Sequence, residues 1–578
     1  MVATGSALGL ERGTRVLLGL AAVAVSFAAA DTYVVVLALP EMMAGVGVSI
    51  DDLQRAAPII SGFLLGYIAI MPLTGRITDL RGRLPVMVGS LVVFALGSLV
   101  TAAAYDLPSM VAGRCIQGVG AGGLLPATLA LVADLYPPRQ RSLPLGVVNA
   151  VQELGNVLGP LYGAIVLAFG GWRDIFWINL AVGLVLAAAL LRLRPRRVTL
   201  SVDRVLVGLG LAAALVVSLV MLQPSRLATS VSLGIGFVPF SGANRWWSPL
   251  GVLAALLIVL VVLRLDPRRW SDIARSADLL SALLLALALA GVILAFATAD
   301  PEVQVFAPEG PWLLSGSLVT AVLFWYRNRS VANPLVPHGA LRRTPAWGAM
   351  VVSFFVGAAL IAAVVDIPIF ARVTVHGGSQ VAAALVLMRF LVGLPVGAFL
   401  GGWLARRVPA GVVVALGMAA SGTGFVWMSQ WGLESLRSPL ATVPLVLGGL
   451  GVGLAMVPVN AALLAATDAP VHGVASSFLV VSRTVGKLVG ISALTTLGLR
   501  RYYAEQADLP GPMEICRGGL TRCPEYTLML RETGLTQLQT IFLGAAVCCV
   551  IAGLVALVVF RHADTRTVRT DPLGAGIG

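Results

Sequence analysis

Charged residues inside long apolar runs are the residues of this sequence most able to do chemistry. The run from about 474 to 498 contains "VSRTVGKLVG", which places Arg483 and Lys487 among apolar neighbours. Glu153 stands in a second apolar run, 142–169. An ionisable group surrounded by hydrocarbon is costly unless it is paired or faces water, so each of these residues is a candidate for ion pairing or proton binding.

We predict that Glu153, Arg483 and Lys487 form a central ion lock. At a rise of about 1.5 Å per residue, the three side chains reach a similar depth in their runs. Arg483 and Lys487 are four residues apart and therefore share one face of a helix. Snorkelling of both cations to the membrane surface is the simpler alternative, but the two residues lie too deep for it. The lock would hold while Glu153 is ionised and open when Glu153 is protonated.

A second set of buried charges is predicted to carry protons. Asp31 and Arg114 reach a similar height in their runs, and a carboxylate beside an arginine in a partly dry cavity can gain and lose a proton. A purely structural ion pair is the alternative. Asp366 and Arg389 occupy the corresponding places later in the chain and are predicted to form a secondary charge pair, although Asp366 lies near a helix end that water can reach.

The elements that hold these residues must be membrane-spanning helices. Hydrophobic residues make up 58% of the 578, charged residues only 12%, and the mean hydropathy is +0.93. Apolar runs of about 17 to 25 residues, each long enough to cross the bilayer as a helix, recur along the whole length. We expect an all-α polytopic membrane protein with about 14 to 16 transmembrane helices.

The net charge of +13 reflects membrane topology rather than nucleic-acid binding. The arginines gather in alternate short loops, such as "GRITDLRGR" and "RLRPRR", which the positive-inside rule places in the cytoplasm together with both termini. The same parity places the polar loop that contains Cys516 and Cys523 outside the cytoplasm. Disulfides persist there, so this pair is a disulfide candidate.

Short internal repeats divide the chain into two similar halves. "GRITDLRGR" and "GGWLARRVP" follow equivalent runs, and "ELGNVLGPLYG" has its counterpart in "RTVGKLVGISA". We expect a six-helix half over 1–197, inserted linker helices over 198–340 and a second six-helix half over 341–578. Repeated halves of this kind place a substrate site at their interface, near the middle of the membrane.

Two glycine-containing motifs indicate close helix packing, and one of them also carries charges. The residues of "GRITDLRGR" that are predicted to form a cytoplasmic gate are Gly75, Arg76, Asp79, Gly82 and Arg83. Their glycines permit a tight turn, and Asp79 among the arginines permits exchangeable ion pairs. The residues of "GNVLGPLYG" that are predicted to form a packing motif are Gly155, Gly159, Pro160 and Gly163. Packing alone would explain the glycines but not the charges.

These motifs resemble signatures of the major facilitator superfamily. The charged loop resembles its G-x-x-x-D-x-x-G-R element, "GRCIQGVGAGG" resembles its R-x-x-Q-G-x-G element, and "GNVLGPLYG" resembles the G-x-x-x-G-P-x-x-G element of its drug/proton antiporters. The stretches "DTYVVV", "WRDIFWIN" and "HGVASSFLVVSRTVGKLVG" look like those of the mycobacterial triacylglyceride exporter family. The likeness covers both halves. That family inserts two helices, whereas four apolar runs stand here, and the pair at 203–222 and 249–265 is the departure.

The resemblance implies the major facilitator fold and a place in the bacterial inner membrane. It also implies a proton-coupled exporter of lipidic or amphiphilic substrates, of triacylglyceride or glycolipid type, that works by alternating access with a periplasmic lipid-carrying lipoprotein. We expect a monomer among membrane lipids, driven by the proton gradient, with no cofactor and no metal.

Two other functions remain open from the sequence. The first is a multidrug/proton antiporter for small hydrophobic drugs, which the antiporter motif of 155–163 also fits. The second is a polytopic membrane enzyme. It is disfavoured because the four histidines lie in loops or at the tail, and because no carboxylate pair or serine–histidine arrangement is evident. We therefore expect a transporter without catalytic residues.

Overall fold

The structure is a bundle of long helices. The computed structural model describes residues 3–48, 53–137, 141–192, 238, 240, 247–264, 278–297, 307–332, 334–337, 339, 341–375, 380–468, 471–507, 509 and 524–563. Within these ranges the regular structure is helical and contains no strand. Twelve helices of this part of the chain are long and apolar enough to cross a membrane. The prediction of an all-α polytopic membrane protein is confirmed.

The first half of the bundle contains the helices before residue 193. These are α1 (Ala3–Gly45), α2 (Leu53–Arg81), α3 (Arg83–Ala102), α4 (Leu107–Gly122), α5 (Leu124–Leu135), α6 (Ser142–Phe169) and α7 (Trp172–Arg192). α4 and α5 follow one another as a single candidate span, Leu107–Leu135. α1 packs along α6, and α4 packs between α2 and α3.

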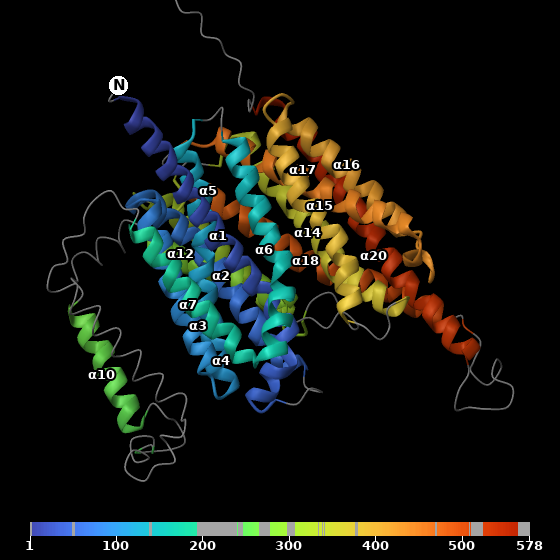
Figure 1. Cartoon of the computed structure of the whole chain (residues 1–578), viewed down its shortest axis with the longest axis horizontal. Helices are drawn as coiled ribbons and strands as arrows, with labels where there is room; N and C mark the ends of the chain where they lie inside the picture. The colour runs from blue at the N-terminus through green and yellow to red at the C-terminus, as the bar shows by residue number, and fades with distance from the viewer. Residues whose placement is uncertain are drawn as a thin grey trace, which may run out of the picture.

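The second half repeats this arrangement beside the first, as Figure 1 shows. Its helices are α14 (Thr344–Val373), α15 (Gln380–Leu404), α16 (Ala410–Met428), α17 (Thr442–Ala466), α18 (His472–Ala507) and α20 (Pro524–Val559). α14 packs along α18, and α17 packs between α15 and α16. The pairs α1–α6 and α14–α18 therefore correspond, as do the groups around α4 and α17.

The sequence repeat explains this correspondence at the level of single residues. A Cβ atom on Gly155 of α6 would lie 2.1 Å from the backbone oxygen of Ser26 on α1. A Cβ atom on Gly486 of α18 would lie 2.0 Å from the backbone oxygen of Phe354 on α14. Only glycine permits such an approach, so the repeated glycines bring the two helices of each pair into backbone contact.

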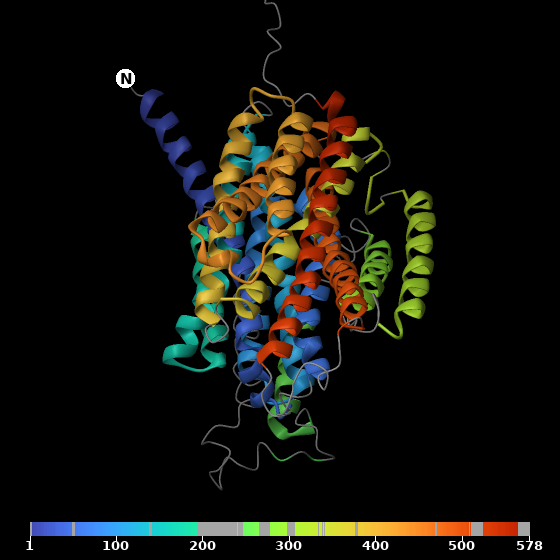
Figure 2. The same cartoon turned by 90° about the vertical axis from the view of Figure 1, so that its right-hand side faces the viewer.

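The start of α1 and the end of α20 lie at the same end of the bundle. Figure 2 shows the start of α1 and the end of α20 there. Because α2 returns from the opposite side, its last residues, including Asp79, lie at this end too. We call it the Asp79 end, and we call the opposite end the far end.

The last two crossing helices are longer than the sequence predicts. α18 and α20 have 36 residues each, whereas apolar runs of 474–499 and 537–560 are expected. A helix of this length measures about 54 Å, against a hydrocarbon thickness of about 30 Å. Figure 1 shows the first turns of α20 projecting beyond the bundle at the far end. The additional turns are polar, so hydropathy alone does not detect them.

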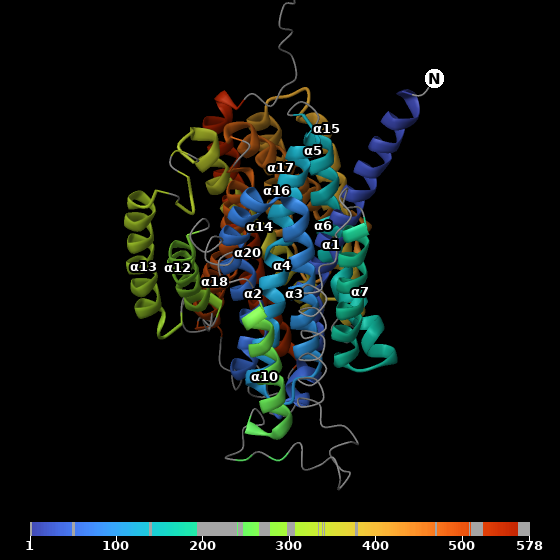
Figure 3. The ribbon, with the colours of Figure 1, turned by 90° about the vertical axis from the view of Figure 1, so that its left-hand side faces the viewer.

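The insert contributes a hairpin that packs on both halves. α12 (Leu279–Ala297) contacts α2 of the first half and α18 of the second, and α13 (Gly310–Ser330) packs on α12. An ion pair of 3.2 Å between Asp278 and Arg327 joins the two helices of the hairpin. Figure 3 shows α13 on the outside of the hairpin.

The other part of the insert differs from a spanning pair. α10 (Pro249–Arg264) has 16 residues, fewer than the roughly 20 that a transmembrane helix needs. Its Leu250 packs against Ala103, which follows α3, and Figure 3 shows α10 extending past the far end of the bundle. The predicted run 203–222 lies outside the described residues.

Candidate functional site

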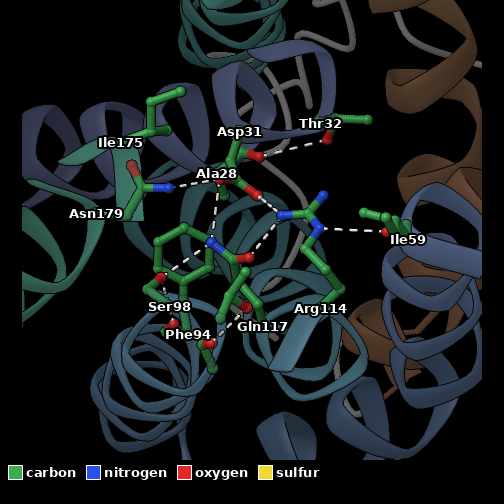
Figure 4. Close-up of polar contacts among 12 residues, drawn as sticks. Ala28, Asp31, Thr32, Ile59, Phe94, Ser98, Arg114, Gln117, Ile175 and Asn179 are labelled. Atoms are coloured by element: carbon green, nitrogen blue, oxygen red, sulfur yellow. Dashed lines mark hydrogen bonds and ion pairs between the residues drawn. The ribbon is translucent and has the colours of Figure 1, made fainter. Parts of the chain in front are cut away.

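Asp31 of α1 is the centre of a buried hydrogen-bond network in the first half (Figure 4). Its Oδ2 atom accepts a bond of 2.7 Å from Arg114 Nη1 on α4. Its Oδ1 atom accepts a bond of 3.0 Å from Gln117 Nε2 and another from Asn179 Nδ2 on α7. The side chains of Asp31 and Arg114 are 0% and 1% exposed. The structure thus brings together the two residues predicted to couple protons.

Arg114, the cation of this pair, makes further contacts of its own. Arg114 Nη1 donates to Gln117 Oε1, and Arg114 Nε donates to the backbone oxygen of Ile59. Its guanidinium lies over the ring of Phe63, 4.3 Å from the centroid. Gln117 Nε2 donates to Ser98 Oγ as well. A buried ion pair is tolerated when further hydrogen bonds satisfy its donors and acceptors, and these contacts supply several of them.

The local sequence sets the height of these donors. α4 begins after Asp106, whose side chain accepts a bond from the backbone N–H of Ser109 in a capping box. α7 begins at Trp172. Arg114 and Asn179 each lie about two turns inside their helix, which is roughly 10 Å from the far end. Both helices start at the far end, so their polar side chains meet Asp31 at one level.

Gln117, Asn179 and Ser98 are further functional candidates, although none of them is ionisable. Their neutral side chains carry no charge signal in the sequence. A usable signal is nevertheless present, since amide side chains are rare in apolar runs and Gln117 lies three residues after Arg114 on the same helix face. The structure also differs from the expected partly dry cavity, because protein atoms enclose the Asp31 carboxylate completely.

Asp79 joins the two halves at the Asp79 end. Its Oδ1 atom accepts a bond of 3.0 Å from the backbone N–H of Gly473, and its Oδ2 atom accepts one of 3.1 Å from Val474. These N–H groups belong to the first turn of α18, so a carboxylate of the first half caps a helix of the second. Arg83 pairs with Asp79 at 2.5 Å and with Asp134 of α5 at 2.9 Å.

Glycines allow this contact between the halves. Gly82 has φ +90°, which L residues with side chains rarely adopt, and it makes the turn between α2 and α3. Gly75 and Gly473 face each other so closely that a Cβ atom on either would lie within 2.6 Å of the other's backbone oxygen. Arg76 is the remaining gate residue, and its buried Nε atom has no hydrogen-bond partner among the described residues.

A second polar contact joins the halves near the same end. Asn460 of α17 donates from Nδ2 to Asn149 Oδ1 on α6 at 3.2 Å, and both residues are buried. Asn149 lies about two turns into α6, and Asn460 about two turns before the end of α17, so both belong to the Asp79 end. The hydrogen bonds described between the halves therefore close this end of the bundle.

Replacing Asp79 with asparagine is expected to weaken closure of the Asp79 end. One amide oxygen cannot serve both backbone N–H groups of α18 and Arg83. Loss of one capping bond and of the negative charge at the start of α18 costs about 1–2 kcal/mol, which would shift the equilibrium between closed and open ends by roughly 5- to 30-fold. Spin labels placed on α2 and α18 at this end would report the change as a longer distance. An unchanged distance distribution would show that the cap does not control closure.

The ion lock remains a prediction. Glu153 lies in α6, but its side chain is outside the described part of the structure. Arg483 is buried, and its Nε donates to Ser353 Oγ on α14 at 3.2 Å, while Lys487 is half-buried. α6 packs on α15 and α17, whereas α18 packs on α2 and α5, so a lock between Glu153 and Arg483 would have to cross the interface of the halves.

No ion pair between Asp366 and Arg389 is present among the described residues, and this secondary charge pair stays a prediction. Arg389 Nη1 donates instead to Thr442 Oγ1 at the start of α17, at 3.1 Å. Asp366 is 3% exposed rather than wet. It shares the α14 face of Phe370, whose ring packs against Trp431. α14 therefore directs Asp366 into the core of the second half, and α15 directs Arg389 towards α17.

The remaining predicted residues fall into two groups. Gly155, Gly159 and Gly163 lie on the face of α6 that contacts α1, against Ser26, Ala30 and Val34. The side chain of Pro160 is outside the described part of the structure. Cys516 and Cys523 lie outside the described residues altogether, so their disulfide stays a prediction. Among the described residues, no group of His, Cys, Asp and Glu side chains could hold a metal ion.

Comparisons with known proteins agree with this architecture. Residues 21–491 match the Major Facilitator Superfamily. A triacylglyceride transporter of Mycolicibacterium smegmatis is 34% identical and aligns with 98% of this chain and 92% of its own. One from Mycobacterium tuberculosis is 33% identical, with 97% of this chain and 98% of its own covered.

Solved structures show the same fold at low sequence identity. The human organic anion transporter has a TM-score of 0.52 and 15% identity, over 93% of this chain and 99% of its own. A proton:xylose symporter has a TM-score of 0.52 and 13% identity, over 94% of this chain and 95% of its own.

Proposed function

This chain belongs to the major facilitator superfamily, and we propose that it exports triacylglycerides or related lipids in exchange for protons. It is a multi-pass membrane transporter rather than an enzyme. The observation that carries the proposal is the enclosed Asp31–Arg114 pair in a chain that aligns almost completely with triacylglyceride transporters. The relatives support the substrate class, and the buried carboxylate supports the coupling to protons.

The proton step follows from the bonds of Asp31. In the closed arrangement Asp31 accepts hydrogen bonds from three donors, on Arg114, Gln117 and Asn179. If α1 moves relative to α4 and α7, the carboxylate loses donors in surroundings of low dielectric, and it then binds a proton. Alternating movement of the helices would thus load and release one proton per cycle at Asp31.

Alternating access would be controlled at the Asp79 end. In this proposal, which follows the positive-inside rule, this end and both termini face the cytoplasmic side of a bacterial inner membrane. The structure described above is then the arrangement that is closed to the cytoplasm. Opening requires Asp79 to release the first turn of α18 and Asn149 to release Asn460. A periplasmic lipid-carrying lipoprotein would receive the substrate at the far end.

Mass spectrometry of lipids that co-purify with the protein tests the substrate class. We expect triacylglycerides or glycolipids to be retained in a defined molar ratio to the protein, and we expect this ratio to change in an Asp31→Asn variant. Recovery of ordinary phospholipids only, together with gradient-driven export of small hydrophobic drugs, would instead support a multidrug antiporter.

A further inference from the structure

Tyr162 of α6 contacts the network of Asp31 through Asn179. The Tyr162 hydroxyl lies 3.3 Å from the backbone oxygen of Ile175 and 3.5 Å from Asn179 Oδ1. Asn179 Nδ2 donates in turn to Asp31 Oδ1. The tyrosine ring is half-buried and lies beside Phe27 of α1, with 6.4 Å between ring centroids. Asn179 therefore links the phenol group of Tyr162 to the carboxylate of Asp31 through two contacts.

The Tyr162 hydroxyl has one proton, for which the backbone oxygen of Ile175 and Asn179 Oδ1 are the two acceptors; when it donates to Oδ1, it favours one orientation of the Asn179 amide. An amide side chain has a donor end and an acceptor end, and rotation by half a turn exchanges them. A hydroxyl that donates to Oδ1 favours the orientation in which Nδ2 points at Asp31. Without the hydroxyl, the reversed orientation would place Oδ1 against a carboxylate oxygen, and the carboxylate would lose a donor.

α6 also reaches the other half of the protein. It packs on α15 and α17, and it carries Asn149, which is bonded to Asn460. Tyr162 follows Asn149 by 13 residues, which is about 20 Å along one helix. The glycines at 155, 159 and 163 pack the same helix on α1 around the level of Asp31. Because Asn149 and Tyr162 lie on one helix, a movement of α6 relative to the second half also moves Tyr162.

We propose that Tyr162 and Asn179 are positioning residues. They link the position of α6 between the two halves to the protonation of Asp31. The inference rests on the proposed proton-coupled function. When α6 is seated, Tyr162 orients Asn179, and Asn179 stabilises the Asp31 carboxylate. When α6 moves, the donor is lost and the carboxylate takes up one proton from the aqueous side, which converts it to a neutral carboxyl group. The titratable groups next to Asp31 in the described part of the chain are Arg114 and Tyr162.

The test compares the pH dependence of lipid export in purified, reconstituted variants. Tyr162→Phe keeps the ring and removes the hydroxyl, so we expect normal folding and an alkaline shift of the export profile by about one pH unit, which is tenfold in proton affinity. Asn179→Leu should shift the profile at least as far. The double variant should shift it no further than Asn179→Leu alone, because the hydroxyl acts through the amide. Tyr326→Phe on the exposed face of α13 is the matched control and should leave the profile unchanged.

The outcomes separate this inference from the proposed function. If Tyr162→Phe and Asn179→Leu keep the wild-type profile while Asp31→Asn loses export, the positioning role is wrong and proton coupling through Asp31 stands. If Asp31→Asn exports normally, the proposed proton coupling through Asp31 is wrong, and the positioning role that depends on it is wrong too. Additive shifts in the double variant would also overturn the inference. Should Asn179→Leu fail to fold, Tyr162→Phe alone decides, because it removes a single oxygen atom.

Discussion

Asp31→Asn is expected to reduce gradient-driven lipid export to the rate measured without a gradient. Asparagine has nearly the same shape as aspartate, but it cannot bind and release a proton at physiological pH. The single amide oxygen can accept from only part of the three donors that surround Asp31, so the variant loses its exchangeable proton and part of this network. Export driven by an imposed pH gradient in sealed vesicles, measured with a fluorescent triacylglyceride analogue, checks this.

The single substitution also leaves Arg114 without an anionic partner in a buried site. Removing one member of a buried ion pair costs about 3–5 kcal/mol, so reduced stability has to be separated from lost coupling. The double variant Asp31→Asn with Arg114→Gln removes both charges. We expect it to regain thermal stability but not gradient-driven export. Recovery of export in the double variant would mean that the pair is structural and that protons are carried elsewhere.

Gly473→Val is expected to prevent closure of the Asp79 end. A Cβ atom at this position would lie 2.5 Å from the backbone oxygen of Gly75 and 2.9 Å from Asp79 Oδ1. Both neighbours would have to move, at a cost of about 1–3 kcal/mol, and the bonds from Gly473 and Val474 to Asp79 would lengthen or break. The protein should then rest with this end open, and export should fall because one half of the transport cycle is disfavoured.

Labelling of single cysteines on α2 and α18 at this end measures the effect. We expect faster labelling in Gly473→Val than in the parent protein. Gly89→Val on α3 is the matched control, since a Cβ atom on Gly89 meets nothing within 4 Å. Equal labelling rates in the parent and in Gly473→Val, with export intact, would show that the Asp79 end does not control access.

The fold was largely predictable from the sequence, because apolar length and helix-packing glycines determine a membrane helix bundle. The repeat of "GNVLGPLYG" and "RTVGKLVG" indicates two halves, and Gly155 and Gly486 make equivalent contacts in the structure. The polar turns of α18 and α20 at the far end escape prediction, because hydropathy reports burial in lipid rather than helix length.

The depth of the site residues along their helices could be predicted from the sequence, but the direction of their side chains around the helix axis could not. Residue number along a helix fixes depth, which is why Asp31 and Arg114 are correctly placed at one level. The direction of a side chain around the helix axis depends on which helices pack against it. Arg389 therefore meets Thr442 rather than Asp366. The neutral residues Gln117 and Asn179 complete the network because a buried carboxylate needs donors, whether or not they are charged.

The movement of protons with lipid tests the central claim most directly. Purified protein in sealed vesicles that hold a pH-sensitive dye should dissipate an imposed pH gradient faster when triacylglyceride is supplied. The increase should depend on the amount of lipid exported and should be absent in Asp31→Asn. Triacylglyceride export that proceeds at the same rate with and without a gradient, and that moves no protons, would contradict the account.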